Sequence, residues 1–302
     1  MRFGWITLGL LMMQPFASGT ELEKYLIIHA DDAGMSHSVN RGTIDAMENG
    51  IVSSASIMVP CPWFKEFAEY ASKHPGRDYG IHLTLNSEWT NYRWGPVASR
   101  DKVPSLVDEE GYLWDNVRQV AENAKANEVE IELRAQIDRA KKFGVPLTHL
   151  DTHMGALFSR PDLLDVYIRL GLEYNLPVLF VRKRLDDLAK EYPALADRGK
   201  ASLQLLEEKG LAILDDVGQF YGGNSHQERR QTYIDFLKSV QPGVTELIIH
   251  CGYDNAELQS ISSSSPRRDG DRRIFCEKEI QQLIDELGIK VVSWKQFQAM
   301  QR

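Results

Sequence analysis

Residues 25–36 read YLIIHADDAGMS, and they contain the clearest signal of the fold. Its first six residues form an apolar run typical of a buried β-strand, and two adjacent acids, Asp31 and Asp32, follow directly. Ser36 then stands where it can cap a helix that runs to about Asn49. A buried strand that passes through a short polar turn into a helix is the repeating unit of a parallel α/β sheet.

The rest of the chain continues this alternation of short apolar runs and helical stretches. Further strands are expected at residues 52–59, 79–85, 147–150, 177–181, 211–214, 246–250 and 289–293. The main helices between them are expected at residues 62–73, 129–143, 161–174, 201–209, 225–240 and 277–287. Seven or eight parallel strands of this kind form either a closed (β/α) barrel or a doubly wound sheet.

Two segments lack this periodicity. Residues 86–127 are irregular and rich in aromatic side chains, which predicts either a binding loop or a loop packed on the core by those aromatics. Residues 262–266 are expected to form a short loop. Neither segment reads as a linker, so we expect a single domain over residues 20–302. The 302 residues, 43% of them hydrophobic, suffice for one large core.

Residues 1–19 have the layout of a secretory signal peptide. Arg2 provides a basic start, an apolar run extends from Trp5 to Met13, and small residues end at Gly19. The apolar run is shorter than the roughly 20 residues of a membrane-spanning helix, so an anchor or a buried helix is the weaker alternative. We expect cleavage near Gly19, a mature protein that is secreted or periplasmic, and no stable membrane insertion.

Charge and cysteine content narrow the functional classes. The net charge is −8 and no Lys/Arg-rich patch is present, which argues against nucleic acid as a partner. The chain has three cysteines, Cys61, Cys251 and Cys276, and an odd number cannot form a complete disulfide framework. It has no CxxC motif, which argues against a structural zinc site. We expect buried cysteines, with the pairing of any two of them left open.

Histidines and acids gather where the expected strands end. The set comprises Asp31, Asp32, His82, His149, Asp151, His153 and His250. A single histidine in an apolar strand is more often a hydrogen-bonded core residue, so only the clusters taken together indicate a site. The carboxyl ends of parallel barrel strands open onto one face, where such side chains meet. One carboxylate and two imidazoles suit a divalent metal, while a second carboxylate and a further histidine suit proton transfer.

Four stretches resemble, in order, the motifs of the YdjC/ChbG family of carbohydrate deacetylases. They are residues 29–42, 80–84, 148–153 and 246–253, and the sequence SPRR at residues 265–268 resembles the stretch that follows them. The resemblance implies a distorted (β/α) barrel related to polysaccharide deacetylases. It also implies one divalent ion, Mg²⁺ or Zn²⁺, held by Asp32, His82 and His153.

The same resemblance assigns the proton-transfer groups. It implies Asp31 as the general base and His250 as the second proton-transfer group. His149 and Asp151 are expected to orient the ligands, and Arg182 is a candidate for holding the substrate or the base. Two imidazoles favour zinc over magnesium.

The expected function is metal-dependent hydrolysis of N-acetyl groups on amino-sugar oligosaccharides or glycans. Two alternatives remain at this point: a metal-dependent hydrolase of another amide or ester, and a non-catalytic sugar-binding protein on the same barrel. A glycosidase is disfavoured because its two carboxylates must stand roughly 5–9.5 Å apart across the bond, whereas Asp31 and Asp32 are adjacent.

Overall fold

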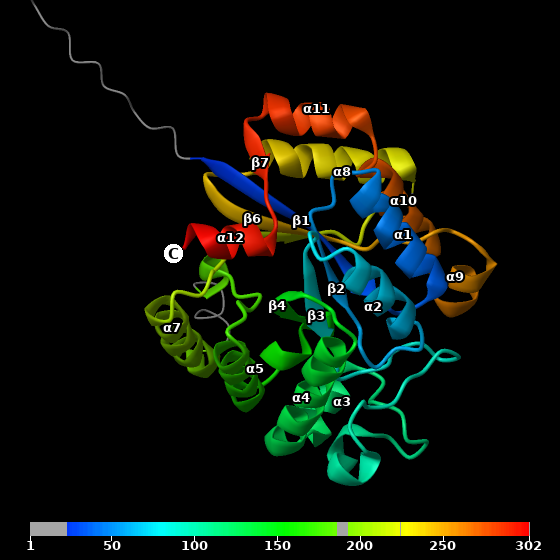
Figure 1. The fold of residues 1–302 in the computed structure, drawn as a ribbon, viewed down its shortest axis with the longest axis vertical. Coiled ribbons are helices and arrows are strands. Elements are labelled where there is room, and N and C mark those ends of the chain that lie inside the picture. Colours follow the sequence, from blue (N-terminus) through cyan, green and yellow to red (C-terminus); the bar gives the residue numbers. More distant parts are fainter. Residues whose placement is uncertain (1–22, 186–192, 224, 302) are drawn as a thin grey trace, which may run out of the picture.

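The computed structural model describes residues 23–185, 193–223 and 225–301. Within these ranges a parallel sheet lies at the centre, and Figure 1 shows the helices packed around it. The strands are β1 (Lys24–Ala33), β2 (Ser54–Ile57), β3 (Tyr79–Leu83), β4 (Leu147–Thr152), β5 (Asp216–Gln219), β6 (Gly243–Ile249) and β7 (Ile289–Val291).

Helices connect the strands in the order of the chain. They are α1 (His37–Glu48), α2 (Phe64–Lys73), α3 (Val117–Asn123), α4 (Ala126–Lys142), α5 (Pro161–Tyr174), α7 (Pro193–Glu208), α8 (His226–Ser239), α9 (Ala256–Ile261), α10 (Ser265–Ile274), α11 (Lys278–Glu286) and α12 (Trp294–Met300). Short 3₁₀ turns are η1 (Arg100–Lys102), η2 (Pro104–Leu106) and η3 (His153–Phe158). Ser36 caps α1, as expected, because its hydroxyl accepts from the Val39 amide.

Backbone pairing carries the strands around a ring. The order is β4-β3-β2-β1-β6-β5, every pair is parallel, and β7 pairs with the beginning of β1. Two isolated parallel bridges, Leu150 with Val178 and Val181 with Leu214, link β4 to the segment just before β5. The expected parallel α/β fold is confirmed, and these bridges close it as a distorted barrel.

The interior of the barrel changes character along its axis. Its lower part is apolar and includes Ile27, Leu214, Val244 and Trp294. A larger apolar cluster fills the space between the strands and the surrounding helices. Buried histidines and acids lie above the apolar floor, toward the carboxyl ends of the strands. The core therefore supports a polar layer at the end of the barrel where parallel barrels carry their sites.

Three of the expected elements differ in the structure. The strand expected at residues 177–181 is not formed, and only single bridges occur there, at Val178 and Val181. The strand expected at residues 211–214 begins at Asp216, because Leu214 pairs instead with Val181 in a single bridge. The loop expected at residues 262–266 contains the start of α10 at Ser265. That helix has no apolar periodicity, and ion pairs to distant acids hold it in place.

The remaining expectations concern the irregular segment, the cysteines and residues 1–19. Apolar side chains of residues 86–127 pack on the core, as the buried Trp94 illustrates, while Glu88 and Trp89 also line a cavity. All three cysteines are free. The signal peptide expected at residues 1–19 lies outside the described residues. Among the helices of the described part, none combines the length and apolar character needed to cross a bilayer.

Candidate metal centre

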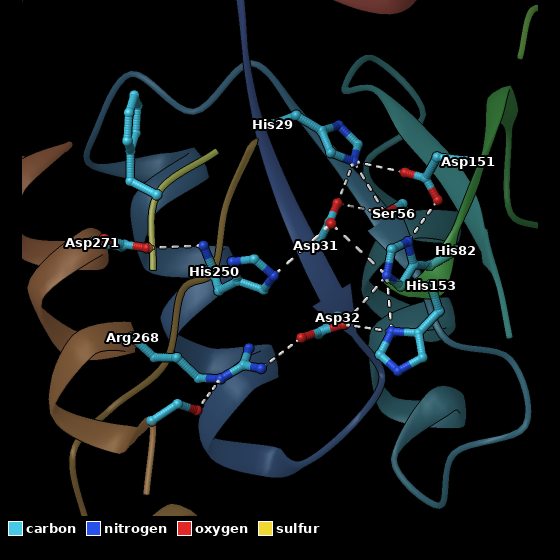
Figure 2. Close-up of polar contacts among 12 residues, drawn as sticks. His29, Asp31, Asp32, Ser56, His82, Asp151, His153, His250, Arg268 and Asp271 are labelled. Carbon is cyan, nitrogen blue, oxygen red and sulfur yellow. Dashed lines mark hydrogen bonds and ion pairs between the residues drawn. The ribbon is translucent and has the colours of Figure 1, made fainter. Parts of the chain in front are cut away.

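Five predicted side chains converge at the carboxyl ends of the strands, as Figure 2 shows. Asp31 and Asp32 lie near the end of β1, and His82 lies on β3. His153 follows β4 directly, and His250 follows β6. All five are at most 7% exposed. Ionisable groups removed from water at such close range need partners, and a bound ion is one of them.

The backbone of β1 is irregular where the two acids occur. Its pairing with β2 shifts register between Ala30 and Ala33, and Asp32 has a φ of +70°. A regular strand would point adjacent side chains to opposite faces, whereas this irregularity turns both acids toward the site. A positive φ is uncommon for residues other than glycine and costs energy, so its presence at Asp32 marks a functional candidate.

Asp32, His82 and His153 bring three ligand atoms together. Asp32 Oδ1 lies 3.4 Å from His82 Nε2 and 3.4 Å from His153 Nδ1. The two imidazole nitrogens are 3.2 Å apart. Ligands that bind one ion tetrahedrally at about 2.0–2.1 Å stand about 3.3 Å from one another. Asp32 Oδ1 is buried and accepts no hydrogen bond, so the set fits a divalent ion.

In each of these three side chains, the second nitrogen or oxygen atom already has a hydrogen-bond partner. Asp151 Oδ1 accepts from His82 Nδ1 at 2.6 Å, and Glu88 lies 3.1 Å from His153 Nε2. Arg268 Nη2 donates to Asp32 Oδ2 at 2.6 Å. Carboxylates that accept the second N–H of an imidazole fix its tautomer and leave the first nitrogen for a metal. The triad is therefore oriented before any ion binds.

Electrostatics in the triad favour cations. Burial lowers the pKa of His153, but Glu88 and Asp32 outweigh it and raise that pKa to about 9. Burial likewise lowers the pKa of His82, yet Asp31 and Asp151 hold it well above its usual range. Burial raises the pKa of Asp32, but Arg268 overcomes this and holds it well below the ordinary value. Without an ion the pocket attracts protons to its imidazoles, and a metal would displace them.

Asp31 lies beside the triad with its two oxygens in different environments. Its Oδ1 lies 3.1 Å from His29 Nε2 and 3.4 Å from the Ser56 hydroxyl. Its Oδ2 lies 3.8 Å from His82 Nε2 and 4.0 Å from His250 Nε2. One oxygen is thus fixed, and the other faces the triad and His250, where it can accept a proton.

His250 stands on the opposite side of the site from His153. Its backbone amide donates to Asp271 Oδ2 at 3.0 Å, and Asp271 is itself paired with Arg229. Its ring lies 5.9 Å from that of Tyr221. Burial, which outweighs the nearby acids, lowers the pKa of His250 to about 4. The imidazole is consequently neutral at neutral pH.

The remaining predicted residues lie farther out. Asp151 contacts His82 and His29. His149 is fully buried below the site and stacks on Trp294. The structure does not bring Arg182 to the site, because Val181 faces the cavity and the next side chain points outward to Glu207.

Three residues that the sequence reasoning did not assign contact the predicted ones. Glu88 lies in the irregular segment, and Arg268 lies on α10. His29 was visible in the opening motif, but its contact with both Asp31 and Asp151 depends on the closure of the barrel. Neither Glu88 nor Arg268 lies at the end of a strand, so the strand-end pattern did not identify them.

Two cavities meet at the centre. One, of about 960 Å³, is lined largely by apolar side chains that include Leu179 and Ile248. The other, of about 740 Å³, is lined by polar groups that include Ser262 and Arg267. His153, Met154, Tyr221 and His250 border both. A substrate that spans the two cavities would pass over the triad.

Comparisons with known proteins match nearly the whole described chain. The sequence model of the YdjC-like protein family matches residues 25–286. A carbohydrate deacetylase of Thermoanaerobacter pseudethanolicus is 31% identical over 272 residues, which are 90% of this chain and 98% of the relative. One of Thermus thermophilus is 34% identical over 263 residues, which are 87% of this chain and 90% of the relative.

Two further matches extend this comparison. A chitooligosaccharide deacetylase of Yersinia enterocolitica is 28% identical over 280 residues, which are 90% of this chain and 99% of that protein. A crystal structure of an Enterococcus faecalis protein named for cellobiose-phosphate cleavage superposes with a TM-score of 0.74. The two chains are 29% identical, and the match covers 91% of this chain and 98% of that one.

Proposed function

The chain belongs to the YdjC-like protein family, and from this we propose that it is a metal-dependent carbohydrate deacetylase that removes N-acetyl groups from amino-sugar oligosaccharides or glycans. The observation that carries the proposal is the convergence of Asp32, His82 and His153 beside Asp31 and His250. The names of the relatives, carbohydrate deacetylase and chitooligosaccharide deacetylase, support the substrate class.

Asp32, His82 and His153 would hold a single divalent ion, Mg²⁺ or Zn²⁺. Two imidazole ligands suit zinc better than magnesium, which prefers oxygen. The ion would polarise the acetyl carbonyl and make water a stronger nucleophile. Asp151, Glu88 and Arg268 would keep these ligand side chains oriented for the ion.

Asp31 is the proposed general base. Its Oδ1 is fixed by His29 and Ser56, so its Oδ2 points to the space beside the triad. In that position Oδ2 takes the proton of the attacking water. The oxygen of this water becomes part of the released acetate, and its proton must reach the departing amine.

His250 is the proposed carrier of that proton. Its Nε2 lies 4.0 Å from Asp31 Oδ2, and burial keeps the ring neutral and able to accept a proton. The proton passes from Asp31 to His250 and then to the nitrogen as the carbon–nitrogen bond breaks. Atoms and charge balance, because the water supplies hydroxide to the acyl carbon and a proton to the amine.

Acetate release from a panel of acetylated sugars tests the proposal. N-acetylated chitooligosaccharides are compared with O-acetylated sugars and with unacetylated cellooligosaccharides, and the metal content of the same preparation is measured. We expect acetate and a free amine from the N-acetylated sugars alone, with one divalent ion per chain.

Other outcomes point to other functions. Release from esters but not from amides would identify a different hydrolase. Binding of sugars without release of acetate would identify a sugar-binding protein. New reducing ends would identify a glycosidase.

A further inference from the structure

His29 lies beside the proposed base, and the proposed mechanism leaves the protonation state of its ring undefined. It lies on β1 two residues before Asp31, and its ring is fully buried inside the barrel. Figure 2 shows the ring above Asp31 and beside Asp151, pointing toward both carboxylates. Burial of an imidazole and two acids costs free energy unless their charges compensate one another.

The Nε2 atom of His29 must carry a proton. It lies 3.1 Å from Asp31 Oδ1 and 3.0 Å from Asp151 Oδ2. Carboxylate oxygens only accept hydrogen bonds when ionised, so the nitrogen between them has to donate. The Ser56 hydroxyl, 3.0 Å away, completes the surroundings of this nitrogen and donates in turn to Asp31.

The hydrogen bonds on the other side of the ring require a second proton. His29 Nδ1 lies 3.0 Å from the Ser54 hydroxyl oxygen. That hydroxyl donates its only hydrogen to Asp78 Oδ1 at 2.6 Å. With its hydrogen committed, the Ser54 oxygen can only accept from Nδ1. Both ring nitrogens therefore donate, which is the hydrogen-bonding pattern of a charged imidazolium.

We propose that His29 is a permanently charged imidazolium that positions the catalytic base: it fixes Asp31 Oδ1 and leaves Oδ2 free to take the proton from water. The role rests on the proposed function of Asp31 as the base. His29 lines neither of the two cavities and contacts no ligand atom of the triad, so it is a positioning residue. Its charge also compensates the two carboxylates, which would otherwise lie buried side by side.

The groups around the ring support this charge. Asp31 and Asp151 face Nε2, Asp78 faces Nδ1 through Ser54, and the ring of His149 lies edge-on at 5.0 Å. Burial alone would lower the pKa of His29, but Glu246 on β6 and then the hydrogen bonds with Asp151 and Asp31 hold that pKa well above its usual range.

Nitrogen NMR of the ring tests the charge directly. Zinc-loaded protein labelled with ¹⁵N-histidine contains eight histidines, and the spectrum of a His29→Gln variant assigns the signals of His29. We expect both ring nitrogens of His29 to remain protonated at about pH 8, well above the ordinary histidine pKa of about 6.5. A single unprotonated nitrogen at that pH would overturn the proposal.

A graded pair of variants tests the positioning role. The His29→Gln substitution keeps an N–H near the two carboxylates without the charge, whereas the shorter side chain in His29→Asn cannot reach them. We expect His29→Asn to lose about 10- to 100-fold in kcat, with KM and metal content unchanged, and His29→Gln to recover part of that loss. The control is His37→Gln, which removes an exposed histidine–glutamate contact outside the barrel.

These experiments separate the two proposals. Wild-type kcat in a folded His29→Asn variant would refute the positioning role. Should that variant not fold, the NMR measurement on the wild-type protein still decides the charge. A wild-type protein that releases no acetate would refute the proposed function, while the protonation of His29 would still be read from the same spectrum.

Discussion

Asp31 and Asp32 are identical in chemistry and adjacent in sequence, yet their surroundings differ. Arg268 holds Asp32 Oδ2, so only Oδ1 of that carboxylate is available to an ion. His29 holds Asp31 Oδ1, so Oδ2 of Asp31 is left to face the triad and His250. Two carboxylates with different neighbours can divide two tasks, and here the division is between metal binding and proton transfer.

Replacement of the base tests this division. Asp31→Asn keeps the shape of the side chain but removes its ability to accept a proton at the same strength. We expect a loss of about 10²–10⁴-fold in kcat with unchanged metal content, measured by acetate release and elemental analysis. Asp138→Asn, on the outer surface of α4, is the control. Near-normal turnover in Asp31→Asn would make Asp31 a structural residue.

His250 can be tested through the leaving group. An amine must be protonated as it departs, whereas the leaving group of an activated ester needs no proton. We expect His250→Ala to retain metal and lose turnover on N-acetyl sugars, and to lose far less on an activated acetyl ester. Equal losses on both substrates, or loss of the metal, would instead indicate a ligand or structural role.

The residues of the site were predictable where strand periodicity determines their position. His82 could be assigned because an apolar run ends around it, and the barrel brings such ends together. Glu88 and Arg268 could not, because one lies in an irregular segment and the other on a polar helix. For Arg182, the position near a strand end was predicted, but the direction of its side chain was not.

Helix α1 approaches the segment that follows His250 unusually closely. A Cβ at Gly42 would lie 2.5 Å from the Cα of Gly252, two residues after His250. Backbone atoms cannot yield as the end of a flexible side chain can, so the absence of a side chain at Gly42 permits this contact. This close contact helps to fix the position of His250, which follows β6.

Gly42→Ala should therefore destabilise the protein although alanine favours helices. Overpacking typically costs about 1–3 kcal/mol, against a gain of up to about 1 kcal/mol in helix propensity. We expect a lower midpoint of denaturant unfolding, together with reduced kcat. Gly76→Ala is the matched control, because nothing lies within 4 Å of its Cβ position. Equal stability of the two variants would contradict this account of the contact.

Elements defined by local signals could be predicted, and those defined by distant contacts could not. Ser36 and the apolar run before it locate β1 and α1 from sequence alone. Helix α10 has the sequence SPRRDGDRRI, and its Arg268 and Arg272 pair with Asp32 and Asp45 more than 200 positions away. The position of this helix depends on ion pairs with residues distant in sequence, and a local sequence pattern does not reveal such pairs.

In the barrel as a whole, the site lies outside the large apolar core. Two apolar clusters lie below and around the strands, and the triad lies above them. Removal of a metal should consequently leave the fold intact, in contrast to small domains that fold only around their ion. The parallel topology and the apolar runs at residues 177–181 and 211–214 were predictable from sequence. That these two runs complete the ring through single bridges, rather than as full strands, was not predictable.

The proposed secretion of the protein concerns residues 1–19 and rests on sequence alone. We propose that these residues are removed near Gly19 and that the mature protein lies outside the cytoplasm. Mass spectrometry of the protein from its natural host is expected to find a chain that begins close to residue 20. A chain that begins at Met1 in a cytosolic fraction would refute the proposal.

The proposed deacetylase depends on a metal ion at the triad, and a titration of metal-free protein measures this dependence. Acetate release from an N-acetylated chitooligosaccharide is followed while Zn²⁺ or Mg²⁺ is added to chelator-treated wild type and to His82→Ala, with circular dichroism as the check on folding. We predict that metal-free wild type is folded and inactive, that activity returns at about one equivalent of ion, and that folded His82→Ala neither binds the ion tightly nor recovers. Full acetate release in the presence of the chelator, or full metal occupancy and activity in His82→Ala, would contradict the account.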